Sequence, residues 1–239
     1  MTRASAIATA IVSSVIVSAA PALAGQQVYI YSVVHPFYGE IGTLTDTINR
    51  SPEVMRIDAR LRIAVRFLGI VVYRQEANTT EIMIGNRLVL LQSVTERDGQ
   101  HLEVHGEAQG DQFVVNATDG SFTGPATTAP SDPWVLKHTG EGPLVYPSTG
   151  RIISVHVSGG DYEAISMNGA SISARHFTVM GENREDVWLD NQGIPVMFRT
   201  VEDGTPIDFM LQSPTAAASA NTVASVKRPA PARRGDGAK

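Results

Sequence analysis

The sequence contains no cysteine and only two tryptophans, and aromatic residues make up 6% of its 239 residues. Without cysteine, the chain can form neither a disulfide nor a thiolate metal site, and it cannot use a cysteine nucleophile. It also lacks a Gly-x-Ser-x-Gly elbow, a His-Glu-x-x-His helix and a phosphate-binding loop. We therefore expect no cofactor and no bound metal, and the chain is more consistent with a binding protein than with an enzyme. A catalytic site assembled from distant strands stays as an alternative.

Helix-length periodicity is also missing, whereas apolar and charged residues alternate in many places. The clearest example runs from Arg56 to Phe67, where aliphatic residues occupy one parity and arginines most of the other. A period of two predicts a half-buried β-strand. Residues 123–133 hold three prolines and predict a long surface loop or a crossing between two halves of a sheet. We predict an all-β fold: a single antiparallel curved sheet, or half-open β-barrel meander, with little helix.

Three segments are expected from composition. An uncharged run followed by Ala22-Leu23-Ala24 predicts a cleaved signal peptide over residues 1–24, so we expect an exported, soluble, periplasmic protein that does not span the membrane. Residues 25–212 form the predicted β domain, with 13 Lys and Arg against 23 Asp and Glu, which argues against nucleic acid as a partner. Residues 213–239 form a basic, Pro/Ala-rich tail that we expect to be disordered. This tail is either a weak tether to the anionic cell envelope or an inert solubilising end.

Three stretches carry a resemblance to known families: LGIVVYR (68–74), GNRLVLLQSVTERDG (85–99) and REDVWLDNQGIPVMFRTVEDGTPIDFML (184–211). They resemble an uncharacterised family of exported proteobacterial all-β proteins, a domain of unknown function. More distantly, the last stretch is similar to the closing hairpins of lipoprotein-carrier-like half-barrels. The resemblance implies a curved antiparallel sheet whose concave apolar side holds an acyl chain. It transfers no catalytic residue.

The aliphatic face of the 56–67 strand and the two tryptophans are the candidate ligand contacts. We accordingly predict a non-catalytic periplasmic binding module for a lipid or other hydrophobic ligand. The alternatives are a periplasmic enzyme, for which His138, His156 and His176 are the candidate bases, and an envelope-associated structural protein. The candidate ligand-binding residues are Leu61, Ile63, Val65, Phe67, Trp134 and Trp188.

Three charged patterns have two interpretations each. The array of His101, Glu103 and His105 suggests a metal site, but residues four apart on a strand lie about 13 Å from each other, which favours a solvated polar face. The arginine face of the 56–67 strand either recognises phosphate headgroups or pairs with carboxylates across strands. Arg74 and Glu81 predict an ion pair across a bend, or a buried pair tuned for function.

Overall fold

The computed structural model describes residues 25–136, 139–167 and 169–215, and in these residues it contains one sheet of 15 strands and a turn of 3₁₀ helix, η1. The first strands are β1 (Gln26–His35), β2 (Gly39–Arg50), β3 (Val54–Phe67), β4 (Ile70–Ile84), β5 (Arg87–Arg97), β6 (Gln100–Gln109), β7 (Gln112–Ala117) and β8 (Gly120–Pro125). The remaining elements are β9 (Ala129–Pro130), η1 (Pro133–Val135), β10 (Gly140–Val145), β11 (Ile152–Met167), β12 (Ala170–Met180), β13 (Arg184–Leu189), β14 (Pro195–Glu202) and β15 (Thr205–Thr215).

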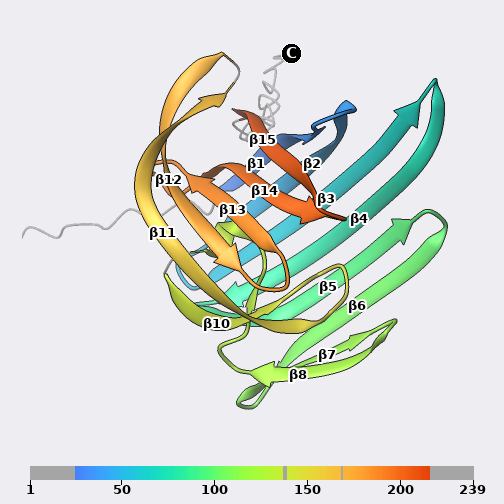
Figure 1. Cartoon of the computed structure of the whole chain (residues 1–239). Coiled ribbons are helices and arrows are strands. Elements are labelled where there is room, and N and C mark those ends of the chain that lie inside the picture. Colours follow the sequence, from blue (N-terminus) through green and yellow to red (C-terminus); the bar gives the residue numbers. More distant parts are fainter. Residues whose placement is uncertain (1–24, 137–138, 168, 216–239) are drawn as a thin grey trace, which may run out of the picture.

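The strands follow one another as an antiparallel meander, broken once (Figure 1). The order across the sheet runs from β8 to β1, then from β15 to β9. The first and last strands therefore pair in the middle of the sheet, and β8 and β9 form its edges. A short parallel pairing joins β9 to β10, and every other pairing is antiparallel. The predicted fold class, an all-β curved sheet, is confirmed.

Side-chain packing brings the two edges of the curved sheet together. β9 lies against β5, and β8 lies against β11. Leu88 and Val115 from one side share a buried cluster with Val145 from the other. At the β10–β11 turn, a Cβ on Gly150 would lie 2.9 Å from the Val115 side chain, so glycine is required by this close approach as well as by its φ of +72°. The sheet thus closes through apolar contacts rather than through a hydrogen-bonded seam.

The alternation predicted for residues 56–67 is present in β3. Ile57 and Val65 are buried, and the arginines of the other parity are exposed. Within the described residues Arg56 pairs with Asp58 of the same strand, at 2.7 Å, while Arg60, Arg62 and Arg66 have no ion pair. The expected cross-strand pairing with carboxylates is therefore wrong for these three arginines: Arg60 and Arg66 face uncharged positions, and Arg62 lies opposite Glu76 without an ion pair in the described residues.

The ion pair expected between Arg74 and Glu81 is also wrong. β4 passes through both residues without a bend, and positions seven apart on a strand point to opposite faces. Glu81 is buried and points inward, whereas Arg74 is exposed and its backbone N–H donates to the Asp98 carboxylate at 2.8 Å.

Residues 123–133 lead from one edge of the sheet to the other. Of the two predictions for this segment, the crossing is therefore confirmed. The crossing is not a surface loop, since Thr128 and Pro130 are buried. It leads into η1, where Asp132 caps the turn by accepting a hydrogen bond from the Trp134 backbone N–H at 2.7 Å. The crossing therefore places polar groups inside the curved sheet.

Several predictions fall on residues without a described structure. The predicted signal peptide (1–24) lies outside the described residues, as does His138. Of the predicted tail (213–239), residues 213–215 form the end of β15, and residues 216–239 lie outside the described residues. No helix of the part that the structure describes is long and apolar enough to cross a bilayer.

Candidate functional site

Three carboxyl groups meet inside the curved sheet. Asp46 comes from β2, Glu81 from β4, and Asp132 from the crossing that enters η1. Asp46 and Glu81 are only 2% and 1% exposed. They lie on the inward parity of their strands, where Leu44 and Ile48 flank Asp46 along β2. The fold therefore carries two acids at positions that a sheet interior normally gives to apolar residues.

Trp134 fixes the position of one of these acids. Its indole Nε1–H donates to Asp46 Oδ2 at 2.8 Å, and its ring lies 4.4 Å from the ring of Tyr29. The guanidinium of Arg50 lies 5.9 Å from the indole centroid. Trp134 is thus a buried anchor that joins η1 to the first two strands.

Among the residues that the structure describes, two carboxylate oxygens of the group have no hydrogen-bond partner. They are Asp46 Oδ1 and Glu81 Oε2, both fully buried. Buried polar atoms are satisfied in the great majority of cases, and an unsatisfied one costs about 1–3 kcal/mol. The sheet therefore keeps two unsatisfied acceptors at one place in its interior.

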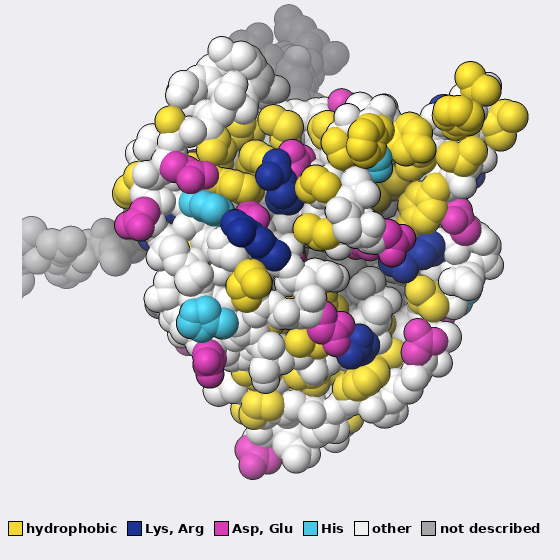
Figure 2. All heavy atoms as spheres, in the orientation of Figure 1, with side chains coloured by type: hydrophobic (Ala, Val, Ile, Leu, Met, Phe, Trp, Pro, Cys, Tyr) yellow, Lys and Arg dark blue, Asp and Glu magenta, His cyan; other side chains and the backbone are white. Residues whose placement is uncertain are grey.

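A cavity of about 400 Å³ lies beside these oxygens. Small side chains on β3 and β4, Ala59 and Ala77, leave the space that larger inward residues would fill. Exposed residues of the lining, such as Glu182 and Glu202, mark where the cavity meets solvent. In Figure 2, charged side chains of both signs lie around the middle of the visible face. The inner lining combines apolar residues, Leu44, Leu61, Val187, Phe198 and Phe209, with polar residues, Asp46, Thr79, Glu81, Ser93, Thr95 and Asp132.

Burial changes the acidity of the carboxyl groups. Burial, then the nearby Asp132 carboxylate, raise the pKa of Asp46 well above its usual range, against the effect of the Trp134 hydrogen bond. Burial, then Asp132 and Asp46, raise the pKa of Glu81 well above its usual range. Burial raises the pKa of Asp132 to about 6. The group therefore holds protons more tightly than exposed acids do.

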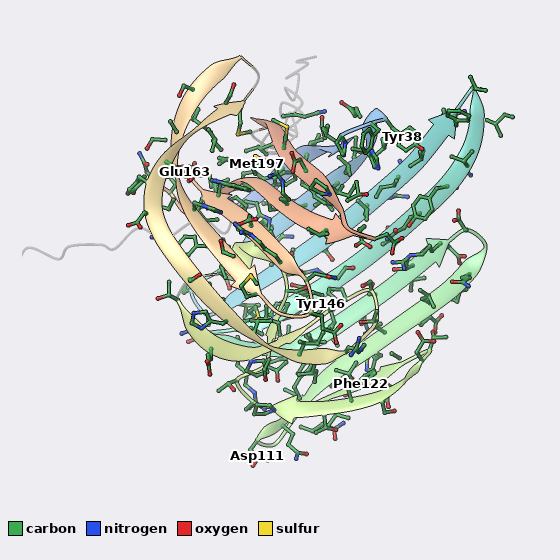
Figure 3. All side chains as sticks on the ribbon, in the orientation of Figure 1. Tyr38, Asp111, Phe122, Tyr146, Glu163 and Met197 are labelled. Atoms are coloured by element: carbon green, nitrogen blue, oxygen red, sulfur yellow. The ribbon has the colours of Figure 1, made fainter. Side chains whose placement is uncertain are left out.

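Glu185 of β13 is another acid of the cavity lining whose pKa is raised. Burial raises the pKa of Glu185 to about 7, against a hydrogen bond from the Tyr146 hydroxyl. Burial also raises the pKa of Tyr146. Tyr146 follows β10, near the centre of the view in Figure 3. Acids with raised pKa values therefore lie on both sides of the same cavity.

The structure places one of the six predicted ligand contacts, Leu61, in the cavity lining. Ile63 and Val65 pack in the main core instead, because β3 runs past the cavity toward its far end. Phe67 lies at the end of β3 and is 57% exposed. The aliphatic face of β3 is thus shared between the cavity, the core and an exposed end.

The two tryptophans are core residues that the cavity lining does not include. Trp188 lies on the face of β13 opposite to Val187, where its ring stacks on His176 at 4.5 Å and its indole N–H donates to Glu163. Their predicted contact with a ligand stays a prediction.

His176 is the one candidate base that contacts a carboxylate in the part of the chain described here. Its Nε2 lies 2.8 Å from Asp186 Oδ1, an oxygen that also accepts from Thr178 and Arg184. This carboxylate is fully engaged, and its hydrogen bonds hold its pKa below the usual range despite the opposing effect of burial. His156 is exposed on β11. The cluster around His176 is therefore organised as a packed ionic network beneath Trp188.

The predicted solvated face of β6 is confirmed. His101, Glu103 and His105 are all exposed. His101 contacts Glu96 and Glu103, and His105 contacts Glu107 at 2.8 Å. Each imidazole thus has a neighbouring carboxylate of its own.

The sequence interpretation missed the acids of the cavity. Leu44, Asp46 and Ile48 occupy one parity of residues 41–48, and none of them is among the predicted site residues. An acid between two aliphatic residues of the same parity is the signal that identifies Asp46. Glu81 gives only half of this signal, since Met83 lies two residues after it but Thr79 lies two residues before it.

Comparisons with known proteins agree with the all-β interpretation. Residues 39–212 match a family described as a domain of unknown function, DUF6134. No curated protein matches the sequence. The chain is similar to the crystal structure of a beta-barrel-like protein of the domain of unknown function DUF1849 from Brucella abortus, with a TM-score of 0.63 and 14% identity. This alignment covers 82% of the present chain and 99% of the other, and at such an identity it shows a shared fold alone.

Proposed function

We propose that this chain, which belongs to the DUF6134 family, is a non-catalytic binding module for a small amphipathic ligand held inside the curved sheet. The ligand class is a lipid or another hydrophobic molecule whose polar head donates hydrogen bonds. The observation that carries the proposal is the pair of buried, unpartnered oxygens, Asp46 Oδ1 and Glu81 Oε2, beside a cavity of about 400 Å³.

The size and lining of the cavity suit such a ligand. Small-molecule sites usually have volumes of about 300–1,000 Å³ and are mostly apolar, with a few polar groups that fix the orientation of the ligand. Phe198 and Phe209 provide an apolar wall opposite the carboxyl groups. The apolar body of a ligand would pack on this wall.

The acids select the polar head. A carboxylate oxygen accepts hydrogen bonds, so a head that matches two free oxygens must donate. An ammonium group donates three hydrogen bonds and also compensates the charge that the carboxyl groups acquire when they ionise. An amine is therefore the preferred head, because its positive charge offsets the cost of ionising the buried carboxyl groups. A hydroxyl group is second, and an ionised carboxylate head is the weakest, because it donates no hydrogen bond and opposes that ionisation.

The proposed location is the periplasm, and it rests on the N-terminal sequence. The small residues that precede Gly25 predict removal of residues 1–24 during export. N-terminal sequencing of the protein from its own cells tests this step. A mature chain that starts at Gly25 supports export, and one that keeps residues 1–24 contradicts cleavage.

Displacement of a fluorescent probe tests the binding function. The full-length protein is loaded with the neutral probe N-phenylnaphthylamine, which is then displaced by dodecylamine, dodecanol or dodecanoic acid. We expect dodecylamine to bind most tightly and dodecanoic acid most weakly. The variant Asp46→Asn/Glu81→Gln keeps the side-chain volumes, and we expect it to lose the preference for the amine by about tenfold or more.

A matched control uses an acid outside the cavity. Asp58 lies on the outer face of β3, where it contacts Arg56 and Thr80, so Asp58→Asn should leave all three affinities unchanged. Ala77→Leu fills the cavity and should weaken all three ligands equally. If the probe shows no saturable binding, or if Ala77→Leu has no effect on it, the proposed function is wrong.

A further inference from the structure

The hairpin of β3 and β4 extends beyond its neighbours in the sheet. Pairing of β3 with β2 reaches Ile63, and pairing of β4 with β5 starts at Gln75. In the part of the chain that the structure describes, residues 64–74 therefore pair only with one another, apart from the contact of Arg74 with Asp98. Four residues of strand span about 13 Å, and the free end is visible at the upper right of Figure 1.

The end of this hairpin is apolar and exposed. Phe67, Leu68 and Ile70 are 57%, 86% and 68% exposed. The adjacent β1–β2 turn, at the same end of the sheet, adds Phe37 and Tyr38, and Tyr38 is labelled at this turn in Figure 3. In Figure 2, hydrophobic side chains cover this projecting part. We call these five residues the hairpin tip.

Leu68 is the residue that distinguishes this turn from two others of the same geometry. Leu68, Asp98 and Asp203 have φ angles of +50°, +46° and +48°, and a glycine with positive φ follows each of them. Two-residue turns of this kind favour Asn, Asp or Gly, because other side chains are strained at positive φ. Leu68 is therefore both strained and exposed. Aspartate occupies the equivalent position in the β5–β6 and β14–β15 turns. A local choice that opposes stability indicates another role for the side chain.

The β3–β4 hairpin that carries most of the tip is basic within an acidic domain. Residues 60–78 contain four arginines and one glutamate. Arg62, Arg66 and Arg74 are exposed and form no ion pair with any described residue. Free guanidinium groups behind an exposed apolar end match the phosphates and acyl chains of an anionic lipid surface.

We infer that the hairpin tip inserts into the interface of an anionic phospholipid bilayer. Leu68, Phe67 and Phe37 enter the boundary between headgroups and acyl chains, and the three arginines contact lipid phosphates. The order of the β1–β2 turn supports this role: His35 Nδ1 accepts from the Phe37 backbone N–H at 3.0 Å, so an ordered turn exposes Phe37. The inference is independent of the ligand proposed for the cavity.

The absence of cysteine allows a direct test by labelling single sites in the full-length chain. Leu68→Cys and Ile84→Cys are each labelled with an environment-sensitive fluorophore. Ile84 is a matched control, because it is 51% exposed at the opposite end of the same strand. With vesicles of phosphatidylcholine and phosphatidylglycerol, we expect a blue shift at position 68 and none at position 84.

Co-sedimentation with the same vesicles gives a second readout. Leu68→Asp relieves the strained turn, so the variant should remain folded. Its affinity for the vesicles should nevertheless fall by about tenfold or more. Ile84→Asp should bind like the unsubstituted protein. Replacing Arg62, Arg66 and Arg74 with Gln should reduce the preference for the anionic vesicles over phosphatidylcholine alone.

Three results would overturn the inference. One is equal vesicle binding by the unsubstituted protein and Leu68→Asp, and another is a blue shift of the same size at both labelled positions. The third is self-association without vesicles that Leu68→Asp abolishes, combined with no vesicle binding, which would assign the hairpin tip to a second copy of the chain.

Discussion

On the side formed by β1 and β12–β15, the interior of the sheet is filled with aromatic and aliphatic side chains. On the side formed by β2–β5, buried aliphatic residues such as Ile57 and Leu91 are joined by carboxyl and hydroxyl groups beside a cavity. Tyr31 represents the first side: it is fully buried, and its hydroxyl donates to the Pro195 carbonyl at 2.9 Å. Glu81 represents the second side, since it is equally buried but keeps an unpartnered oxygen.

The two sides of the interior contribute to different properties of the molecule. A filled interior with satisfied polar atoms maximises stability. A polar interior with free acceptors lowers stability, and proteins tolerate such a cost mainly at functional sites. We therefore assign stability to the first side and ligand binding to the second.

Truncation of a core aromatic residue should have the largest effect. Tyr31→Ala removes a ring that lies edge-on to Phe198 at 5.5 Å, and we expect a loss of about 3–5 kcal/mol in the free energy of unfolding. Thr95→Ala on the polar side removes a much smaller buried group and should cost about 1 kcal/mol. Urea unfolding measures both, and similar losses would contradict the division into two sides.

Neutralising the buried acids should increase the free energy of unfolding instead of lowering it. Asp46→Asn/Glu81→Gln removes two groups that cannot ionise without a desolvation cost, so we expect the free energy of unfolding to rise by about 1–3 kcal/mol at neutral pH. The control Asp58→Asn breaks an exposed pair with Arg56 and should lower stability slightly. A double variant that is less stable than the unsubstituted protein would show that the acids support the fold.

The dependence of stability on pH should follow from the raised pKa values. A carboxyl group with a higher pKa in the folded state stabilises the fold below its unfolded pKa, and this stabilisation is lost as the pH rises through the folded pKa. For Asp132 and Glu185, with pKa values of about 6 and about 7, the loss extends from about pH 4 to about pH 7. We expect Tm to fall over this range, and Glu185→Gln should remove its upper part. A Tm that rises from about pH 4 to about pH 7 would contradict the assignment.

The smallest effect is expected at the hairpin tip. Leu68→Asp replaces a strained residue with the type found in two equivalent turns, so the free energy of unfolding should increase by about 0.5–1 kcal/mol. Asp98→Leu makes the reverse change and also removes the bond to the Arg74 backbone, so it should destabilise the fold. Thermal unfolding of both variants measures these changes in stability. If both substitutions changed stability in the same direction, the result would be inconsistent with strain at Leu68.

Much of the fold could be predicted from the sequence, because alternation and turn residues act locally. The β3 strand is an example. The closure of the sheet could not be predicted, since it depends on contacts such as Val115 with Val145 that no local pattern reveals. β4 was predicted only in pieces, because polar residues at positions 74–81 hide its alternation.

The candidate site was harder to predict than the fold. Leu61 was identified because it continues an aliphatic face. Asp46, Glu81 and Asp132 come from three separate segments, and only the folded sheet brings them to one cavity. Their residue types suggest exposed positions, so their burial became apparent only from the packing around them.

Native mass spectrometry of the protein purified from its own cells tests the central claim most directly. We expect the unsubstituted protein to carry a small molecule, Asp58→Asn to carry it too, and Asp46→Asn/Glu81→Gln to lack it. A ligand-free unsubstituted protein, or a double variant that carries the same molecule to the same extent, would contradict the assignment of the polar side to ligand binding.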